Sequence, residues 1–399
     1  MQVPRFEPFA AIRYATTLPL DDVAAPPYDV LSDADVDALL ARHPNNIVAI
    51  DVPRERDGEH RYQAAAHRLA EWIAAGVMVR DSQPSFTLYR MQFTDAAGVH
   101  RETVGVMGGL EVVDEGAGGV LPHERTTPKA KTDRLDLTRA TGANLSPVWG
   151  LSLTPGLTDL LRAPGEPLGD YHDENGVRHI VERVSDVERV AAISAAVGAN
   201  RVLIADGHHR YAISRTFRDE VRATHGDGTA AELTLTYVAE LVDEQLSIDA
   251  IHRLYPLTSA EELASLLAPS FEITEAGPVD SAFAGEVIRR GALCLVRPDG
   301  SGAWLTPRPD LVADVRALDG AYLEYALRSV EIDVAYQHGV DHVVSMVAER
   351  GGSAVLIRPT SIDEIRRTAD ERLLMPPKST FFTPKLRTGL VIRPLDLPH

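Results

Sequence analysis

The sequence predicts an α+β protein with mixed sheets and peripheral helices. Helical signals come first, in residues 26–46 after an extended entry and in residues 59–77, and two strand-like runs follow at 86–93 and 102–113. Later helical and strand-like segments also come without a regular strand–helix alternation. A doubly wound parallel sheet requires that alternation, so we expect mixed sheets instead.

The two early helices carry recognisable start and stop signals. Ser32 is a good N-cap for the first helix because Asp35 follows three positions later. The second helix has Leu69 and Ile73 on one apolar face and ends near Gly76. These signals predict two helices.

A long polar passage occupies residues 119–147, where we expect almost no helix. Connections of this length in a compact protein are usually functional or disordered, and Leu121, Leu135 and Leu137 favour the functional interpretation. Beyond it, the pattern predicts strands at 201–205, 232–241, 353–358 and 388–393 and a loop at 375–385.

The length of 399 residues suits two or three lobes. Glycine, proline and acidic residues gather at 153–176, which indicates an insertion or an edge between lobes. We therefore predict three lobes, with the bounds 1–155, 156–260 and 261–399.

The net charge of −18 argues against a broad nucleic-acid surface and against an anionic membrane as partner. A locally basic pocket on such an acidic chain indicates a small anionic or amino-acid-like substrate. No run approaches about 18 apolar residues and the N-terminus lacks an apolar signal core, so we expect no membrane span. Cys294, the one cysteine, lies in an apolar run, which predicts a buried strand residue. The lack of an intrachain disulfide fits a cytoplasmic protein, and the oligomeric state is left open.

The stretch RVLIADGHHRYAIS, residues 201–214, joins a β-type run to a helix. Ile213, Phe217 and Val221 fall on one helical stripe, so the helix begins just after Gly207. The first N–H groups of a helix lack internal partners and carry partial positive charge, which favours an anion. A glycine at this turn lets the backbone approach a ligand closely.

The side chains that follow this glycine suit the same ligand. Arg210 offers a planar fork that matches phosphate, and His208 and His209 can donate hydrogen bonds or move protons near neutral pH. The turn is thus predicted to be a phosphate cradle. Two other interpretations stay open: an ordinary turn with a capping histidine and a surface ion pair, or a metal site. Adjacent histidines rarely point at one ion, which disfavours the metal.

Three other segments add polar chemistry. LPHERTTPKAKTDRL, residues 121–135, holds His123 beside Glu124, a potential acid/base pair, and TGANLSPV follows at 141–148. MPPKSTFFTPK, residues 375–385, and APPYDVLS, residues 25–32, supply cations and a carboxylate. Each segment alone also fits an ordinary solvated loop or rigid turn. Together they provide the anion cradle, cations and carboxylate base that phosphoryl chemistry needs. Their polar residues are Asp29, His123, Glu124, Lys129, Lys131, Arg134, Asn144, Ser146, Lys378, Ser379, Thr380 and Lys385.

Five motifs, in this order, closely resemble the bacterial family catalogued as domain of unknown function 1015. They are PPYDVLS, PHERTTPKAKTDRL, GANLSPVWGL, ADGHHRYA and MPPKSTFFTPKL. The resemblance covers essentially the whole chain. It implies kinship more than chemistry, because the family is poorly characterised.

The segment DGHHRY also resembles the Asp-Gly-X-His-Arg signature of the ParB/sulfiredoxin superfamily, which includes archaeal free-serine kinases. In that superfamily the element lies at a helix N-terminus and binds nucleotide phosphates. The resemblance therefore implies a ParB/sulfiredoxin-like nucleotide-binding element in this fold. Sulfiredoxins carry a catalytic cysteine in the motif, whereas this chain has His208 and His209, which disfavours sulfinic-acid reduction.

The motifs and the resemblance lead to one main hypothesis, a nucleotide-dependent phosphotransferase that acts on a small hydroxyl metabolite such as free L-serine. ATP or ADP with Mg²⁺ would be the cofactor. Glu124 is the first choice for the base that orients the hydroxyl, with Asp29 second. The predicted catalytic residues are Glu124, His123, Asp29 and His209. The predicted cofactor-binding residues are Asp206, Gly207, His208, His209, Arg210, Lys129, Lys378 and Ser379.

Two alternatives use the same cradle. One is a phosphatase or phosphotransferase for phosphoserine-like metabolites, and the other is a ParB-like nucleotide-binding regulatory module. The sequence has no Walker A pattern, so a P-loop enzyme is excluded. The acidic net charge and the lack of a clear helix-turn-helix argue against DNA as a partner of the regulatory module.

Overall fold

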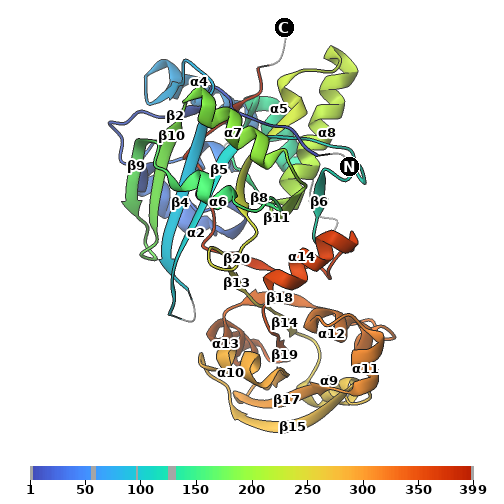
Figure 1. The fold of residues 1–399 in the computed structure, drawn as a ribbon. Coiled ribbons are helices and arrows are strands. Elements are labelled where there is room, and N and C mark those ends of the chain that lie inside the picture. The colour runs from blue at the N-terminus through green and yellow to red at the C-terminus, as the bar shows by residue number, and fades with distance from the viewer. Residues whose placement is uncertain (1–2, 55–59, 96–97, 125–131, 397–399) are drawn as a thin grey trace. The chain divides into compact units, whose positions relative to one another are not determined.

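The structure is a computed structural model, and it describes residues 3–54, 60–95, 98–124 and 132–396. The chain forms two compact units (Figure 1). The first comprises Met1–Pro122, Thr126–Leu246 and Pro384–His399, and the second comprises His123–Arg125 and Ser247–Thr383. The boundary between 246 and 247 falls inside the second predicted lobe, 156–260. The division into three lobes stays a prediction.

The first unit is built on a mixed sheet of nine strands in the order β6-β11-β8-β12-β5-β4-β10-β9, with β1 paired to β5. The pairs β6/β11 and β8/β12 are parallel and the others are antiparallel. The strands are β1 Phe6–Glu7, β4 Phe86–Thr94, β5 His100–Glu111, β6 Val120–Pro122, β8 Val148–Ser152, β9 Glu166–His172, β10 Arg178–Val184, β11 Val202–Asp206 and β12 Leu233–Glu240.

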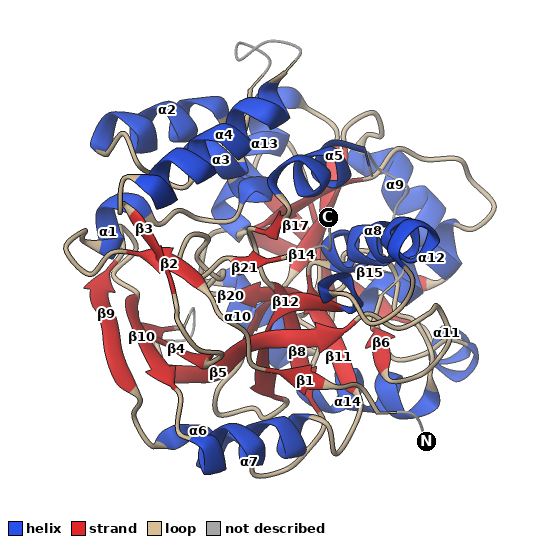
Figure 2. Cartoon of the chain, turned by 90° about the horizontal axis from the view of Figure 1, so that it is seen from above, coloured by secondary structure: helices blue, strands red, loops and turns tan. Residues whose placement is uncertain are grey.

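Helices cover both faces of this sheet (Figure 2). Apolar residues of α6 and α7 pack with the strands into one core cluster, and α2, α3 and α4 form another with β2. The helices are α1 Leu20–Val23, α2 Asp33–Arg42, α3 Val48–Asp51, α4 Arg61–Ala74, α5 Thr132–Thr141, α6 Leu157–Arg162, α7 Val187–Val197 and α8 His208–His225, with 3-10 turns η1 Tyr28–Val30 and η3 Ala230–Glu232. Two small ribbons pair β2 Ile12–Tyr14 with β3 Met78–Arg80 and β7 Ala143–Asn144 with β21 Arg393–Pro394.

The predicted start of α2 is confirmed in detail. The Ser32 hydroxyl accepts the Asp35 N–H at 3.2 Å, and the Asp35 carboxylate accepts the Ser32 N–H at 2.8 Å. This reciprocal pair satisfies two backbone donors that a helix start otherwise leaves unpaired. The second predicted helix is α4, and Gly76 follows it with a φ of +72°.

The expectation that 119–147 is nearly free of helix is wrong, because α5 spans Thr132–Thr141. Leu135 packs in a cluster with Ile213 and Phe217 of α8, whereas Leu137 packs in the cluster of α2, α3 and α4. The helix therefore buries two different sides between α4 and α8. Residues two positions apart do not form the single apolar stripe by which a surface helix is recognised.

The second unit has its own antiparallel sheet of six strands, ordered β15-β17-β16-β19-β14-β18. One core cluster on it contains residues of α9 and α12, and another contains residues of α10 and α13. The elements are β13 Ser247–Asp249, β14 Ile251–Tyr255, α9 Ala260–Leu267, β15 Phe271–Pro278, α10 Phe283–Arg290, β16 Leu293–Val296, β17 Ser301–Pro307, α11 Pro309–Asp314, α12 Asp319–Leu327, β18 Ala335–His338, α13 Val340–Arg350, β19 Ser353–Leu356, α14 Ile362–Glu371 and β20 Phe381–Thr383.

The predicted last strand, 388–393, is not a regular strand. Thr388 and Ile392 make isolated bridges to two different segments, and β21 begins only at Arg393. Gly389 lies between the two bridges with a φ of +93°, which interrupts the extended run. The α+β class with mixed sheets and peripheral helices is confirmed, as is the burial of Cys294 in β16. No helix in the described ranges is long and apolar enough to cross a membrane.

Candidate functional site

The turn between β11 and α8 has the predicted strand-to-helix geometry. β11 ends at Asp206, Gly207 has a φ of +85°, and α8 begins at His208. A Cβ at Gly207 would lie 3.0 Å from Arg210 Nε and 3.3 Å from Val148 Cα. Both the backbone conformation and the lack of space therefore require glycine here. His208 and His209 form the first turn of α8 and are half-buried.

Asp206 holds two cations on one carboxylate oxygen. Its Oδ2 lies 3.4 Å from Arg210 Nη2 and 3.4 Å from Lys385 Nζ. Burial by itself raises the pKa of Asp206, but the charges of Lys385 and Arg210 outweigh burial and hold that pKa well below its usual range. The carboxylate is therefore ionised at neutral pH, with two cations beside the N-terminus of an 18-residue helix.

Arg210 joins this group to the opposite side of the turn. Its Nη1 donates to the Pro147 carbonyl, directly before β8. Burial by itself lowers the pKa of Arg210, but the charges of Asp206 and Asp29 raise that pKa overall. The guanidinium is thus a fixed cation whose position is set by the last residue of β11 and by the residue before β8.

A small polar cavity lies beside Arg210 in the first unit. It has a volume of about 50 Å³ and brings together the start of α8, the α5 helix, η1 and the segment before β8. A cavity of this size holds a few water molecules or one small polar group. Its lining residues are Tyr28, Asp51, Arg134, Leu137, Thr138, Ala143, Asn144, Leu145, Ser146, Arg210, Ile213, Ser214 and Thr234.

Asp51 is a carboxylate of this cavity that the sequence analysis missed. It is 2 % exposed, and its Oδ1 accepts hydrogen bonds from Arg134 Nη1 at 3.1 Å and from Ser146 Oγ at 3.0 Å. Burial raises the pKa of Asp51, although Arg134 and Ser146 lower it. Asp51 ends a one-turn helix in an apolar stretch, VAID, so no local pattern distinguished it.

The PPYD motif reaches the same cavity. The Arg134 guanidinium carbon lies 4.0 Å from the centre of the Tyr28 ring, which is a cation–π contact. Burial raises the pKa of Tyr28, so its hydroxyl remains a donor at neutral pH. Asp29 is exposed, next to this ring, and its charge acts on Arg210.

Lys385 is a second residue missing from the predicted site. Only four of the 40 basic residues are lysines, namely Lys129, Lys131, Lys378 and Lys385. All four lie in the two basic motifs. In a chain that otherwise uses arginine, a lysine indicates a position where a compact ammonium is required rather than a planar fork. That bias was the available signal for Lys385.

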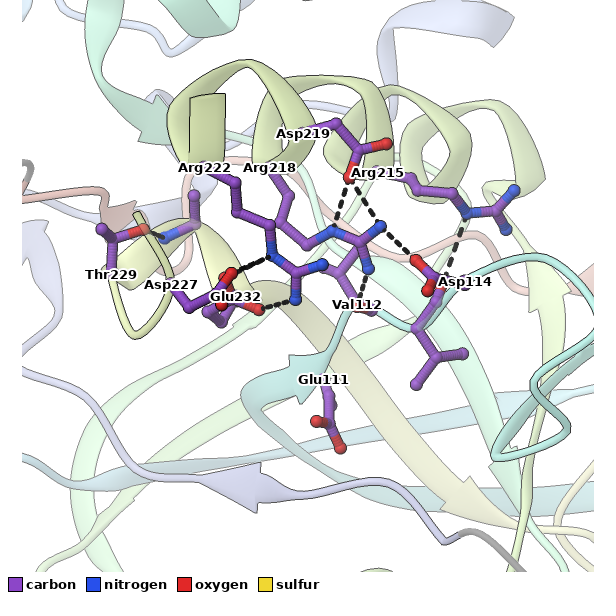
Figure 3. A network of polar contacts seen from close by, with 12 residues as sticks. Glu111, Val112, Asp114, Arg215, Arg218, Asp219, Arg222, Asp227, Thr229 and Glu232 are labelled. Atoms are coloured by element: carbon purple, nitrogen blue, oxygen red, sulfur yellow. Dashed lines mark hydrogen bonds and ion pairs between the residues drawn. The ribbon is translucent and has the colours of Figure 1, made fainter. Parts of the chain in front are cut away.

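A separate charged network anchors α8 further along its length (Figure 3). Arg218 is 2 % exposed and donates to the Val112 carbonyl, to Asp114 at 2.6 Å and to Asp219 at 2.7 Å. Arg222 forms a fork on Glu232, with its Nε at 2.8 Å. These contacts fix the helix to the end of β5 and to η3, and so fix the position of its N-terminus.

The predicted acid/base pair lies in the second unit with the MPPKST loop. His123 Nε2 lies 2.6 Å from Thr380 Oγ1, and Glu124 Oε2 accepts the Ser379 N–H at 3.0 Å. The His123 carbonyl also accepts the Met375 N–H at 2.9 Å. Two motifs more than 250 positions apart therefore form one cluster.

Arg253 of β14 holds the same loop. Its guanidinium donates to the carbonyls of Lys378 at 3.1 Å and Pro377 at 3.3 Å. Lys378 is exposed and has a φ of +57°, a conformation that non-glycine residues rarely adopt. The arginine stabilises this backbone and so presents the lysine at the surface of the second unit.

The predicted site residues thus form two groups. Asp29, Asp206, Gly207, His208, His209 and Arg210 lie in the first unit, and His123, Glu124, Lys378 and Ser379 lie in the second. Lys129 and Lys131 lie outside the described residues. In the described part of the chain, no group of three or more His, Cys, Asp or Glu side chains could hold a metal ion by itself.

Residues 6–326 match the family described as "Protein of unknown function (DUF1015)". The chain belongs to this family. The match covers most of the chain, and the kinship expected from the five motifs is confirmed. No curated protein matches the sequence.

Several solved structures are similar to this chain at low scores. A mutant free serine kinase in complex with ADP is 13 % identical with a TM-score of 0.38, covering 66 % of this chain and 84 % of that one. A conserved hypothetical protein from Pyrococcus furiosus is 15 % identical with a TM-score of 0.38, covering 70 % and 94 %. SbnI with a C-terminal truncation, from Staphylococcus aureus, is 14 % identical with a TM-score of 0.40, covering 72 % and 87 %. At these values the likenesses assign neither an activity nor a ligand to this chain.

Proposed function

We propose that this protein is a nucleotide-dependent phosphotransferase that acts on a small hydroxyl metabolite, with free L-serine as one candidate. The observation that carries the proposal is the ionised Asp206 carboxylate, held between Arg210 and Lys385 at the glycine-started N-terminus of α8. Cations and helix N–H groups stabilise the charge of a transferring phosphoryl group. They also exclude the large apolar substrates that an uncharged cleft would admit.

The phosphate-binding role falls to Arg210, Lys385 and the first N–H groups of α8. Phosphoryl transfer needs little covalent help from a protein, so most of the catalysis is positioning and electrostatic stabilisation. Arg210 is held by the Pro147 carbonyl and by Asp206, and Lys385 contacts the same Asp206 carboxylate. This rigid arrangement holds donors in place before the ligand arrives, which lowers the reorganisation needed during transfer.

Asp206 suits a Mg²⁺ ion that arrives with a nucleotide. Mg²⁺ usually binds one or two carboxylates and completes its shell with phosphate oxygens and water. The ion would neutralise phosphate charge when bound. Because the described residues contain no larger ligand cluster, we expect no tight metal binding in the absence of nucleotide.

The acceptor hydroxyl needs a base to take its proton. In the transfer, the hydroxyl oxygen bonds to phosphorus, the bond from phosphorus to the nucleotide oxygen breaks, and the proton passes to a carboxylate. Asp29 is exposed beside Tyr28 and its charge acts on Arg210. Glu124, in the second unit, has one carboxylate oxygen on the Ser379 N–H. Both remain candidate bases.

The size of the cavity favours a second candidate function. A volume of about 50 Å³ beside Arg210 accommodates a phosphate-sized group. A phosphatase or phosphotransferase that acts on a phosphorylated metabolite such as phosphoserine would use the same cations without a bound nucleotide. The two candidates differ in which ligand stabilises the folded protein.

A ligand panel tests the proposal. Thermal unfolding is followed with ATP, ADP, pyrophosphate, L-serine and phosphoserine, each with Mg²⁺ and with a chelator. A ligand that binds only the folded state raises the melting temperature. We expect ATP or ADP with Mg²⁺ to stabilise, and phosphorus NMR to detect a new phosphate monoester when L-serine or another small alcohol is added. Stabilisation by phosphoserine and not by either nucleotide would instead establish the second candidate.

A further inference from the structure

Arg387 is a buried arginine that none of the functions described above uses. It is 5 % exposed and lies in the first unit, two residues after Lys385. Its Nη1 and Nη2 donate to the two carboxylate oxygens of Glu174 at 3.2 and 3.0 Å, and Nη1 lies 3.8 Å from Asp173 Oδ2. Two carboxylates from the turn after β9 therefore hold one guanidinium.

Buried aromatic residues fix one of these carboxylates, that of Asp173, in turn. His179 of β10 is fully buried, and its Nε2 lies 3.1 Å from Asp173 Oδ2 while its Nδ1 lies 2.7 Å from the Tyr89 hydroxyl. The Tyr171 ring stacks on His179 with 4.9 Å between ring centres. The receptor for Arg387 is thus built from three neighbouring strands, β4, β9 and β10.

The charges of this receptor are fixed at neutral pH. Burial by itself raises the pKa of Asp173 and of Glu174, but hydrogen bonds from His179 and Arg387, respectively, lower each pKa overall. Burial lowers the pKa of His179, so the imidazole is neutral and does not repel the guanidinium. An ionised pair of carboxylates is a permanent anchor for an arginine.

The backbone around Arg387 connects this anchor to both sides of the candidate site. On one side, Lys385 places its ammonium on Asp206. On the other side, Thr388 and Ala25 exchange backbone hydrogen bonds at 2.8 and 3.1 Å, three residues before Tyr28. Residues 385–388 therefore form a short segment that contacts Asp206 at one end and Ala25 at the other, and the ion pairs of Arg387 hold it between these two contacts.

We propose that Arg387 is a positioning residue, which fixes residues 385–388 so that the Lys385 ammonium lies on Asp206 and the site binds phosphate. The part of this inference that concerns phosphate rests on the proposed function. The part that concerns the placement of Lys385 does not. An arginine suits this task because its planar guanidinium makes a bidentate contact with a carboxylate, whereas a lysine would hold residues 385–388 through a single ammonium group.

Chemical labelling of lysines tests the placement without any ligand. The chain has only four lysines, so trace acetylation and mass spectrometry give the reactivity of each, with the exposed Lys378 as internal reference. We expect Lys385 to react more slowly than Lys378 in the wild type, and Arg387→Met to raise the relative reactivity of Lys385 several-fold. Glu174→Gln, at a 45 % exposed side chain, should do the same more weakly and is the safer variant for folding.

Arg90→Met is the matched control, because Arg90 is also a buried arginine of the first unit, with an ion pair to Glu182 at 2.9 Å. It should lower stability without changing the reactivity of Lys385. Equal reactivity of Lys385 in the wild type, in Arg387→Met and in Glu174→Gln would overturn the inference.

A double-mutant cycle with pyrophosphate then tests the consequence for binding. If Arg387 acts through Lys385, Arg387→Met and Lys385→Met each weaken pyrophosphate binding about tenfold, and the double variant is no weaker than Lys385→Met alone. Additive losses would mean that Arg387 acts independently of Lys385, which contradicts the inference. Unchanged binding in Lys385→Met would instead remove Lys385 from the proposed phosphate site, and the labelling result would stand by itself.

Discussion

The Lys385 ammonium lies 3.4 Å from the Asp206 carboxylate, although 179 positions separate the two residues in the sequence. The contact ties the segment after β20 to the turn before α8, and it places a second cation beside Arg210. One anionic side chain therefore organises two cations at a helix N-terminus. Under the proposed function, a ligand phosphate would bind this group by replacing part of the contact between the carboxylate and its cations.

Arg210→Ala is expected to weaken the binding of pyrophosphate or nucleotide by roughly 10- to 100-fold, since a charged hydrogen bond contributes about 1.5–3 kcal/mol. The fold should persist, because the rest of α8 is anchored through Arg218 and Arg222. Calorimetric titration measures the affinity. Arg215→Ala, on the same helix and paired with the exposed Glu115, is the control and should bind as the wild type does. Equal affinities of the two variants would disprove the assignment of Arg210.

Gly207→Ala should damage both stability and ligand binding. A left-handed alanine costs about 1–2 kcal/mol, and its Cβ would lie 3.0 Å from Arg210 Nε and displace that side chain. Gly226→Ala is the control, since Gly226 ends the same helix at a φ of +78° and a ψ of −173°, a backbone conformation nearly restricted to glycine, with nothing within 4 Å of a Cβ. Chemical denaturation should show a loss of stability in Gly226→Ala that is at least as large as that in Gly207→Ala, while titration shows weaker anion binding only in Gly207→Ala. Weaker binding in both would point to a general loosening of α8.

Asp51→Ala should lower the free energy of unfolding by about 3–5 kcal/mol, because it leaves the Arg134 guanidinium without its buried partner. Asp133 also contacts Arg134, at 3.2 Å, but its side chain is 39 % exposed. Asp133→Ala is therefore expected to change stability by at most about 1 kcal/mol. Urea denaturation of the two variants compares a buried and an exposed partner of one arginine. A small effect in both would show that Arg134 does not depend on Asp51.

His252 predicts a pH dependence of stability in the second unit. Its Nδ1 accepts the Ile357 N–H at 3.2 Å, and burial, with the nearby Arg253 and His338, lowers the pKa of His252 from 6.5 to about 4. Between these values the unfolded chain binds a proton that the folded protein does not. The stabilisation is fully present above pH 6.5 and falls by about 1.4 kcal/mol per pH unit as the pH drops toward 4.

Denaturation curves at several pH values check this slope. His252→Asn keeps an acceptor for Ile357 and removes the titrating ring, so its stability should be lower at pH 7 but should fall less steeply below pH 6.5 than that of the wild type. Other buried histidines such as His179 contribute equally in both proteins and cancel in the comparison. Parallel pH profiles would contradict the role of His252.

Local chemistry explains which features the sequence predicted. The start of α2 at Ser32 and the turn at Gly207 depend on contacts within a few residues, so the sequence contains the necessary information. α5 was not predicted because Leu135 and Leu137 are buried against different helices, and the sequence pattern does not show which helices these are. The strand predicted at 388–393 failed because Gly389, with a φ of +93°, interrupts the extended run between two isolated bridges.

The same distinction applies to the candidate site. The motif DGHHR was recognisable because its residues are consecutive and its glycine has a local conformational cause. Asp51 was not, because its function depends on Arg134 and Ser146, which lie 83 and 95 positions away. Lys385 was intermediate: the scarcity of lysine was a signal that could have indicated it, but only the folded chain places it on Asp206.

Two variants test which carboxylate, Glu124 or Asp29, accepts the proton of the acceptor hydroxyl. Glu124→Gln and Asp29→Asn each remove one carboxylate charge and keep the shape of the side chain. Whichever residue accepts the proton, its variant should slow turnover by roughly 10²–10⁴-fold, the usual contribution of a general base, while nucleotide affinity stays within about twofold. The other variant should retain most of its activity. Because the Glu124 carboxylate accepts the Ser379 N–H, a glutamine can still accept that bond, so Glu124→Gln tests charge rather than loop structure. Loss of nucleotide binding in either variant would make that residue a binding or structural group, and full activity in both would remove carboxylate base catalysis by these two residues from the proposed mechanism.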